Sequence, residues 1–397
     1  MKKQISLRKA AAIGILAVFV CSLVTGIAVY CVVHPSGQMG ELYDAVEEAN
    51  DIAQQHFVGE YETKDLIDYT LTGYAQGLGD RWTSYMTPEY YQSYLESAAD
   101  TTVGIGVTVS YAELDDGSHV LRVESVAHGS PAEKAGFGCY DAIISVNGKS
   151  IDALGTYDDA VGAVRGDAGE QVTLGVRRYK TEKEESIAVT RAEYDQIHVT
   201  SRMLDHDIGY ICIERFTDKT DEQFKEALDA VQKQGAKSLI FDLRNNPGGQ
   251  LTALVNCLDP LLPKGDIISL KDKQGKESKY ESDEEEIDLP MAVLVNEDSY
   301  SAAEFFAAAL QEYGKADIVG EKTVGKGYSQ QSFPLSNGGC LNLSTSCYYT
   351  PKGISLIDKG VIPDREAALS EEKTERFYVL SDQEDDQLQA AISVLVS

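Results

Sequence analysis

Residues 296–311 read N-E-D-S-Y-S-A-A-E-F-F-A-A-A-L-Q and directly follow a short apolar run, A-V-L-V, at 292–295. The apolar run is typical of a buried strand, and the alanine-rich stretch favours a helix that ends before Gly314. A strand, a tight polar turn and a helix in this order would lift Ser301 to the carboxyl edge of a sheet. The first amides of the helix are unpaired there and point at whatever the serine attacks. An ordinary N-capping serine is the alternative interpretation of the same stretch.

A candidate base for Ser301 lies 25 residues downstream. Residues 320–331 read G-E-K-T-V-G-K-G-Y-S-Q-Q, in which Lys326 is flanked by glycines and Gln330 follows four residues later. A lysine acts as a base when burial removes its charge, because desolvation lowers the pKa of an amine. Gln330 lies on the same side as Lys326 in either a strand or a helix. Its amide could therefore fix the direction of the amine, as the third member of a catalytic triad does.

Two other classes of enzyme find less support. All 6 histidines precede Ile208, so a Ser-His hydrolase would need His198 or His206 to fold back to the serine. Substituting either histidine by alanine would expose such a role. A nucleotide-dependent enzyme would need a phosphate loop or a dinucleotide fingerprint, and the sequence contains neither.

Three motifs resemble those of the carboxyl-terminal processing peptidases (tail-specific proteases, serine peptidase family S41), which are Ser-Lys proteases that mostly carry a PDZ domain. The motifs are S-Y-S-A-A-E (299–304), T-V-G-K-G-Y-S-Q (323–330) and F-D-L-R-N-N-P-G-G-Q-L (241–251). The family pattern usually reads S-A-S-A-S-E, so Tyr300 and Ala303 depart from it while Ser301 is kept. These departures touch neighbours of the serine and therefore bear on substrate fit more than on catalysis.

The pattern after Thr200 alternates between strands and helices. Strands are expected at 208–216 and 238–243 with a helix at 221–234 between them, which favours an α/β core with a largely parallel sheet. The charged stretch 271–288 is interpreted as an exposed hairpin or solvated arm. Residues 339–351 alternate like a strand, and 387–396 form a short amphipathic helix.

The turn N-N-P-G-G at 245–249 follows the second of these strands, where α/β sheets place ligand-binding loops. Two adjacent glycines offer amides to a developing oxyanion, although such a sequence is more often a plain turn. The family resemblance implies that Gly248 or Gly249, together with the Ala302 amide, forms the oxyanion hole. It also implies a ClpP/crotonase-like peptidase core and no metal or organic cofactor.

Residues 101–193 resemble a PDZ domain. G-I-G-V at Gly104, Ile105, Gly106 and Val107 matches the loop whose backbone amides hold the terminal carboxylate of a peptide. S-P-A-E-K-A-G (130–136) and I-I-S-V-N-G (143–148) are similar to the flanking PDZ signatures. Such a groove would bind an apolar C-terminal tail as an added strand. Arg165 is a candidate regulatory residue between this domain and the protease, with a solvated surface arginine as the alternative.

The N-terminus predicts a membrane anchor. Residues 1–9 carry four positive charges and no acid, and residues 10–33 are uncharged. As a helix, 24 residues would be roughly 36 Å long, enough to span a bilayer with the positive flank inside. A cleaved signal peptide is the alternative, but the apolar run is longer than a usual signal core. The remainder of the protein should then lie outside the cytoplasm of a bacterium.

Composition sets wider limits. A chain of 397 residues predicts two or three domains, and the net charge of −29 argues against nucleic-acid partners. The 7 cysteines show no metal-ligand spacing. The segment 80–89 reads D-R-W-T-S-Y-M-T-P-E and resembles a structural segment of the family, with a helix beginning at Pro88.

The expected fold is an α/β and α+β multidomain chain. Its expected parts are a cytoplasmic tail (1–9), a transmembrane anchor (10–33), a helical segment (34–100), a PDZ domain (101–193), a peptidase core (194–370) and a C-terminal tail with a helix (371–397). The expected function is serine endopeptidase activity near the C-termini of protein substrates. A non-catalytic PDZ scaffold that binds peptide tails is the alternative. The sequence leaves homo-oligomerisation and the physiological substrate open.

Overall fold

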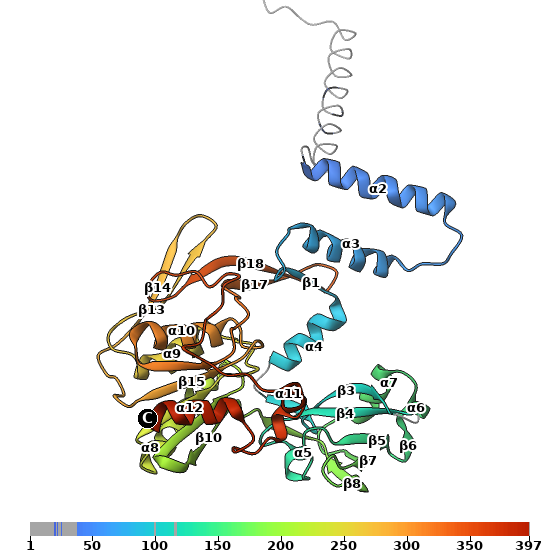
Figure 1. Cartoon of the computed structure of the whole chain (residues 1–397). Coiled ribbons are helices and arrows are strands. Elements are labelled where there is room, and N and C mark those ends of the chain that lie inside the picture. The colour runs from blue at the N-terminus through green and yellow to red at the C-terminus, as the bar shows by residue number, and fades with distance from the viewer. Residues whose placement is uncertain are drawn as a thin grey trace, which may run out of the picture. The chain divides into compact units, whose positions relative to one another are not determined.

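The computed structural model describes residues 38–98, 101–114 and 117–396, together with Val20, Ser22 and Thr25. The chain divides into two compact units, Met1–Tyr69 and Thr70–Ser397 (Figure 1). The predicted anchor at 10–33 lies outside the described residues apart from those three positions. Within the described part, the helices are all too short or too polar to cross a bilayer.

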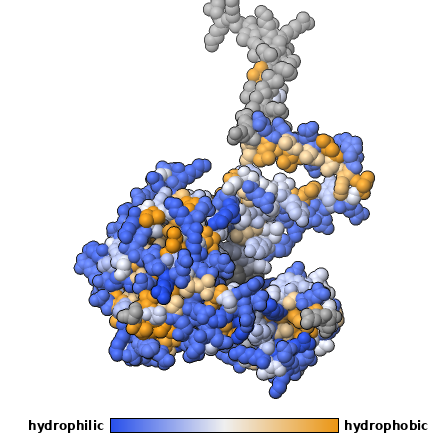
Figure 2. Space-filling view, viewed as in Figure 1, coloured by the Kyte–Doolittle hydropathy of each residue, from blue (hydrophilic) through white to orange (hydrophobic). Residues whose placement is uncertain are grey.

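The structure describes three helices in the segment 34–100. It contains α2 (Gln38–His56), α3 (Thr63–Gly77), which runs from the first unit into the second, and α4 (Pro88–Ala98). Pro88 begins α4 as expected, and the Tyr90 amide donates to the Thr87 hydroxyl at 3.3 Å. On α2, exposed apolar side chains gather among polar ones (Figure 2): Met39, Leu42, Val46 and Ile52.

A β-rich domain follows α4. Its sheet has the strand order β3-β4-β5-β7-β8, with β6 paired to β5. These strands are β3 (Val107–Glu113), β4 (His119–Val126), β5 (Ala142–Val146), β6 (Lys149–Ser150), β7 (Gln171–Arg177) and β8 (Glu184–Thr190). The helices α5 (Pro131–Lys134), α6 (Ile151–Leu154) and α7 (Tyr157–Val164) complete it. The short strands β2 (Thr101–Gly104) and β9 (Ala192–Asp195) pair with each other and so join the entry and the exit of the domain.

The core of the second unit is a six-stranded sheet with the order β10-β11-β12-β15-β16-β19. Its strands are β10 (Val199–Leu204), β11 (Ile208–Ile213), β12 (Ser238–Asp242), β15 (Met291–Val295), β16 (Ala316–Gly320) and β19 (Arg365–Glu366). All neighbouring pairs are parallel except β10 with β11. The largely parallel sheet predicted from the alternation of strands and helices is therefore confirmed.

Helices cover both faces of this sheet. α8 (Thr220–Lys233), α9 (Leu251–Leu258) and α10 (Ala302–Tyr313) pack with Leu239 and Phe241 of β12 in one core cluster. α12 (Asp386–Val396) packs with Ile240 in another. Because successive side chains of a strand point to opposite faces, a parallel sheet covered on both sides needs continuous apolar strands. This explains why L-I-F at 239–241 and A-V-L-V at 292–295 lack alternation.

A second sheet is built on β18 (Cys340–Tyr349), the predicted strand at 339–351. It has the order β1-β18-β13-β14, with β17 (Tyr328–Pro334) also paired to β18. β1 spans Ser84–Met86, and β13 (Gly265–Asp272) and β14 (Glu277–Ser282) form an antiparallel hairpin. The predicted charged arm thus contains the turn of this hairpin and β14.

One expected strand ends early. β11 stops at Ile213 rather than at Phe216, because the chain then leaves the ladder to meet the turn at 245–249. The Phe216 amide donates to the Gly248 carbonyl at 2.9 Å, and the Gln250 amide donates to the Phe216 carbonyl at 2.7 Å. The end of β11 and the glycine turn are therefore fixed to each other.

Candidate active site

Ser301 occupies the turn that connects β15 to α10, as the sequence predicts. Its backbone has φ 60° and ψ −121°, a left-handed conformation that costs a non-glycine residue about 1–3 kcal/mol. Two hydrogen bonds hold this turn. The Tyr300 amide donates to the Asn246 carbonyl at 3.1 Å, and the Ser301 amide donates to Oε2 of Glu304 at 2.9 Å.

The carboxylate of Glu304 is completely buried. It joins the turn that contains Ser301 (the serine turn) to the loop at 323–326 (the lysine loop). Oε2 accepts from the amides of Ser301 at 2.9 Å and Lys326 at 2.8 Å. Oε1 accepts from the Thr323 hydroxyl at 2.6 Å and the Gly325 amide at 2.7 Å. One oxygen atom therefore lies within hydrogen-bond distance of the backbone of both the predicted nucleophile and the predicted base.

Glu304 lies within the motif at 299–304, but the motif by itself indicates no role for it. A signal for it exists, because Ser301 and Glu304 have the S-x-x-E spacing of a helix capping box. In such a box the glutamate reaches back to the amide of the capping residue, as Glu304 does here. The sequence does not reveal that the same carboxylate also receives the loop at 323–326.

The two glycines that flank Lys326 allow the backbone of its loop to approach the segment 354–360 closely. A Cβ on Gly325, which has φ +87°, would lie 3.0 Å from the Asp358 backbone. A Cβ on Gly327 would lie 2.7 Å from Cγ1 of Ile357. The loop that carries Lys326 is thereby packed against this segment as well as bonded to Glu304.

The amine of Lys326 lies close to two aromatic rings. Its Nζ is 4.8 Å from the Trp82 ring centroid and 5.5 Å from the Tyr300 ring centroid, and the rings stack with centroids 6.0 Å apart. Burial lowers the pKa of Lys326 below its ordinary value, although the charges of Asp80 and Glu304 oppose this effect. The amine is therefore biased toward the neutral form that a base requires.

Gln330 reaches Lys326 indirectly. Its Nε2 donates to the backbone carbonyl of Trp82, and the Trp82 amide donates to Asp80 Oδ1 at 3.1 Å. Among the described residues, these contacts fix the ring that covers the lysine. The segment 80–89, interpreted from sequence as structural, thus brings Trp82 into the site.

The glycine turn lies directly against the serine. A Cβ on Gly248, which has φ +87°, would lie 2.7 Å from Cβ of Ser301 and 2.8 Å from the Ala302 nitrogen. The Gly248 amide donates to Asn246 Oδ1 at 2.7 Å. In the described part of the chain, the amides of Gly249 and Ala302 donate no hydrogen bond. The residues predicted to form an oxyanion hole are therefore adjacent to Ser301.

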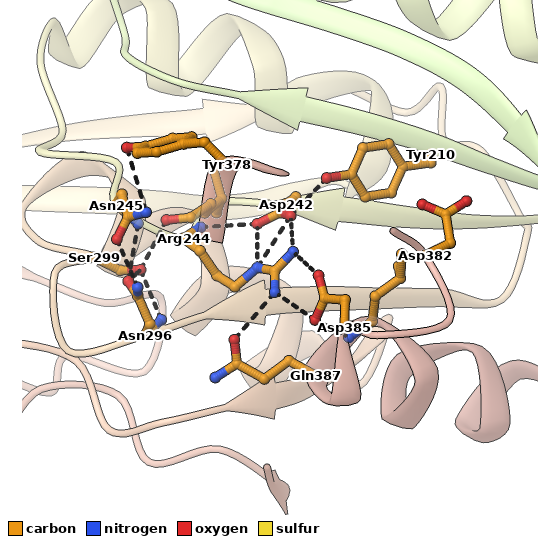
Figure 3. Close-up of polar contacts among 12 residues, drawn as sticks. Tyr210, Asp242, Arg244, Asn245, Asn296, Ser299, Tyr378, Asp382, Asp385 and Gln387 are labelled. Atoms are coloured by element: carbon orange, nitrogen blue, oxygen red, sulfur yellow. Dashed lines mark hydrogen bonds and ion pairs between the residues drawn. The ribbon is translucent and has the colours of Figure 1, made fainter. Parts of the chain in front are cut away.

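A polar network supports both turns from behind (Figure 3). The amide of Asn245 donates to Asn296 Oδ1 at 2.9 Å, and Asn296 Nδ2 returns a bond to Asn245 Oδ1 at 2.7 Å. The Ser299 hydroxyl donates to the Leu243 carbonyl at 2.8 Å. Side-chain amides and a hydroxyl thus hold the turn after β12 against the turn after β15.

Arg244 anchors the first of these turns to the C-terminal segment. Its buried guanidinium contacts Asp242 at 2.5 Å and Asp385 at 2.9 Å, and donates to Gln387 Oε1 at 3.1 Å (Figure 3). The Tyr210 hydroxyl also donates to Asp242, at 2.6 Å. This network was not predicted, because its partners are 141 and 143 residues from Arg244 in sequence.

The predicted peptide-binding loop opens into a separate cavity of about 770 Å³. Gly104, Ile105, Gly106 and Val107 line it together with Arg165. The Ile105 carbonyl accepts from the Ala132 amide at 2.7 Å. The amides of Ile105 and Gly106 form no hydrogen bond with any described residue. The loop therefore presents unpaired donors beside a groove that has both polar and apolar lining residues.

Comparison with known proteins agrees with this geometry. Residues 207–367 match the family model of peptidase family S41, and residues 122–178 match a PDZ domain model. The chain is 32% identical over 329 residues to the "Carboxy-terminal processing protease CtpA" of Bacillus subtilis (strain 168), covering 82% of this chain and 69% of that protein. This chain belongs to the carboxy-terminal processing proteases of family S41. The resemblance inferred from three motifs is confirmed.

Two further matches extend the comparison. The "Probable CtpA-like serine protease" of Staphylococcus aureus (strain N315) is 34% identical over 327 residues, which cover 80% of this chain and 63% of that protein. The chain thus spans less than two thirds of the length of that relative. A solved Bacteroides fragilis structure assigned to the S41 proteases aligns with a TM-score of 0.60 at 18% identity, over 81% of this chain and 87% of that one. It shows a shared fold.

The histidines lie away from the serine of this S41 family member. His206 precedes β11, whereas Ser301 follows β15, and these parallel strands place the two residues at opposite edges of the sheet. His198 precedes β10, which β11 and β12 separate from β15. Three strand spacings amount to roughly 14 Å. The geometry thus favours Lys326 over either histidine as a base.

We predict that Glu304→Gln destabilises the site although the two side chains have the same shape. An amide offers one acceptor oxygen, so two of the four donors on the carboxylate would face an NH₂ group. Buried unpaired donors cost about 1–3 kcal/mol each, so the apparent free energy of unfolding should fall by roughly 3 kcal/mol in urea titrations. The exposed Glu297→Gln on the same turn is the matched control, and equal effects of both changes would contradict this role.

We also predict that the pKa of Lys326 lies below 10.5, the ordinary value for lysine, because burial disfavours the charged amine. Trp82 is the 1 tryptophan of the chain, and its ring faces the amine. Its emission should therefore change as the ammonium becomes neutral, and this change should be absent from Lys326→Met. A lysine-dependent midpoint at or above pH 10.5 would show that the cationic form is not disfavoured.

Proposed function

We propose that this chain is a serine endopeptidase that cleaves protein substrates near their C-termini, with Ser301 as nucleophile and Lys326 as base. The observation that carries the proposal is the shared oxygen of Glu304, which accepts from the backbone amides of both residues. The strained backbone of Ser301 and the lowered pKa of Lys326 support it further. Strain and perturbed pKa values gather at functional sites.

In the proposed reaction, neutral Lys326 takes the proton of the Ser301 hydroxyl as the oxygen attacks the scissile carbonyl. The resulting ammonium then donates a proton to the leaving amine when the C–N bond breaks, leaving an acyl-enzyme. Water hydrolyses this ester by the same exchange of protons. The faces of Trp82 and Tyr300 stabilise the intermediate ammonium, because aromatic faces attract cations. Gln330 orients the lysine through Trp82.

The oxyanion of the tetrahedral intermediate would be bound by backbone amides. The Ala302 amide, at the first position of α10, is one donor, and the second comes from Gly248 or Gly249. Gly248 is closest to Ser301 but would have to release Asn246 Oδ1, whereas no described residue accepts from the Gly249 amide. Each such donor is typically worth about 10²–10³ in rate.

The PDZ domain would bind the substrate tail. The unpaired amides of Ile105 and Gly106 suit a terminal carboxylate, and the groove beside them is lined by Val107, Val161 and Val164. A tail with an apolar last residue would add a strand there. Arg165 lines the same cavity, which supports a role in sensing the tail and regulating the protease.

Catalysis is tested with the full chain and a loosely folded protein substrate that ends in apolar residues, with products assigned by mass spectrometry. Ser301→Ala and Lys326→Ala should each reduce cleavage by at least about 10³-fold, because each removes a group used in bond breaking. Both variants should still bind the tail.

The exposed residues Ser336 and Lys359 provide matched controls, and Ser336→Ala and Lys359→Ala should cleave normally. Undiminished cleavage by Ser301→Ala would exclude this mechanism. Tail binding without any cleavage by the parent chain would instead favour the scaffold.

We further propose that residues 10–33 form an uncleaved anchor that holds the protease on the outer side of a bacterial membrane. The proposal rests on 24 uncharged residues after a positively charged start. The full chain should stay with bacterial membranes after an alkaline wash, and added protease should digest it in intact spheroplasts. Recovery in the soluble fraction with a new N-terminus near residue 33 would identify a cleaved signal peptide instead.

A further inference from the structure

Most arginines in the described part of the chain form ion pairs with carboxylates. Eight of the eleven do so: Arg81, Arg122, Arg177, Arg178, Arg191, Arg202, Arg244 and Arg376. Arg165, Arg215 and Arg365 have no carboxylate partner among the described residues. In a protein with a net charge of −29, an arginine without an acidic partner keeps its guanidinium free to bind an anionic ligand.

Two of these three arginines line the same cavity. Arg165 and Arg215 both border the 770 Å³ cavity into which the predicted peptide-binding loop at 104–107 (here called the amide loop) opens. Asp167 is the one carboxylate in this lining, and it forms no ion pair with either arginine. The cavity thus combines two guanidinium groups with the free amides of Ile105 and Gly106.

The two arginines come from different domains. Arg165 is the C-cap residue of α7 in the PDZ domain, and its amide donates to the Val161 carbonyl at 3.0 Å. The last carbonyls of α7 are also satisfied by Arg191, whose Nε donates to the Val164 carbonyl at 2.9 Å. Because Arg191 binds this helix end, the guanidinium of Arg165 remains available to a ligand.

Arg215 belongs to the peptidase core, between β11 and the bridge that Phe216 forms with the glycine turn. Its carbonyl accepts from the Thr220 hydroxyl at 2.9 Å, which fixes its backbone. Burial raises the pKa of Tyr300, and the charge of Arg215 acts against that rise. The positive charge of Arg215 therefore acts on Tyr300, the residue next to Ser301.

We propose that Arg215 is a second carboxylate-binding residue of the tail cavity. The C-terminal carboxylate of a bound tail would lie between the amide loop with Arg165 on the PDZ side and Arg215 on the peptidase side. This inference rests on the proposed binding of substrate tails by the PDZ domain. Arginine suits the position because its planar fork binds a carboxylate through two parallel hydrogen bonds.

Such a shared carboxylate would connect tail binding to the catalytic site. Arg215 is followed directly by Phe216, whose amide donates to the Gly248 carbonyl at 2.9 Å. Gly248 in turn lies against Ser301. A tail whose carboxylate binds Arg215 therefore acts directly beside Phe216, the residue that holds the glycine turn. A tail without a free carboxylate does not.

The test measures tail affinity in the full chain carrying Ser301→Ala, which prevents cleavage. Two fluorescent peptides of one apolar sequence are compared, one ending in a free carboxylate and the other in a carboxamide. In this background the carboxylate peptide should bind at least about tenfold more tightly, because charge-assisted hydrogen bonds are strong. Adding Arg215→Gln should reduce that ratio about fivefold or more without changing the carboxamide affinity, and Arg215→Lys should restore part of it.

Arg365→Gln is the matched control, because Arg365 also lacks a carboxylate partner but lies on β19, outside the cavity lining. It should keep the full ratio. If Arg215→Gln also keeps the ratio, or weakens both peptides equally, Arg215 does not bind the carboxylate, and tail binding by the PDZ domain still stands. If the Ser301→Ala chain itself binds both peptides equally, the proposed tail recognition and this inference both fail.

Discussion

The buried carboxylate of Glu304 is the constraint on which the site depends. A carboxylate without solvent must be fully hydrogen-bonded, and all four donors to Glu304 come from the serine turn and the lysine loop. Hydrogen bonding of both carboxylate oxygens therefore requires these two segments to lie together. The same bonds help to keep the Ser301 backbone in a conformation that it would otherwise avoid. Folding and assembly of the site are thus a single event at this residue.

Lys326 is balanced between opposing effects. Burial disfavours its charge, while Asp80, Glu304 and the faces of Trp82 and Tyr300 favour it. A group that must take a proton and release it again benefits from such a balance, because a strongly depressed pKa would make the amine a weak base and an ordinary pKa would leave little free amine. Tyr300, which departs from the family motif, contributes one of the two rings. This departure therefore bears on the surroundings of the proposed base as well as on substrate fit.

The sequence was sufficient wherever the information was local. The apolar run at 292–295, the alanine-rich stretch and Gly314 predicted the β15–α10 turn, and three short motifs were enough to identify the family. Contacts between distant segments were not accessible in the same way. Nothing around Trp82 indicates that its ring covers a lysine more than two hundred residues away. The early end of β11 at Ile213 has a similar cause, because a tertiary bridge from Phe216 to Gly249 overrides the strand propensity of the segment. Gln330 was assigned to Lys326 from spacing, whereas its amide contacts the backbone of Trp82.

The Arg244 network has a consequence for biosynthesis. Asp385 and Gln387 leave the ribosome 141 and 143 residues after Arg244. At about 5–20 residues per second, a nascent chain carries Arg244 without these partners for roughly 7–30 s. Asp242 is then its sole carboxylate among the described contacts, and the turn that bears Gly248 lacks its support from α12. The support that the C-terminal segment gives to this turn therefore arrives late in translation, when the bulk of the polypeptide has already been made.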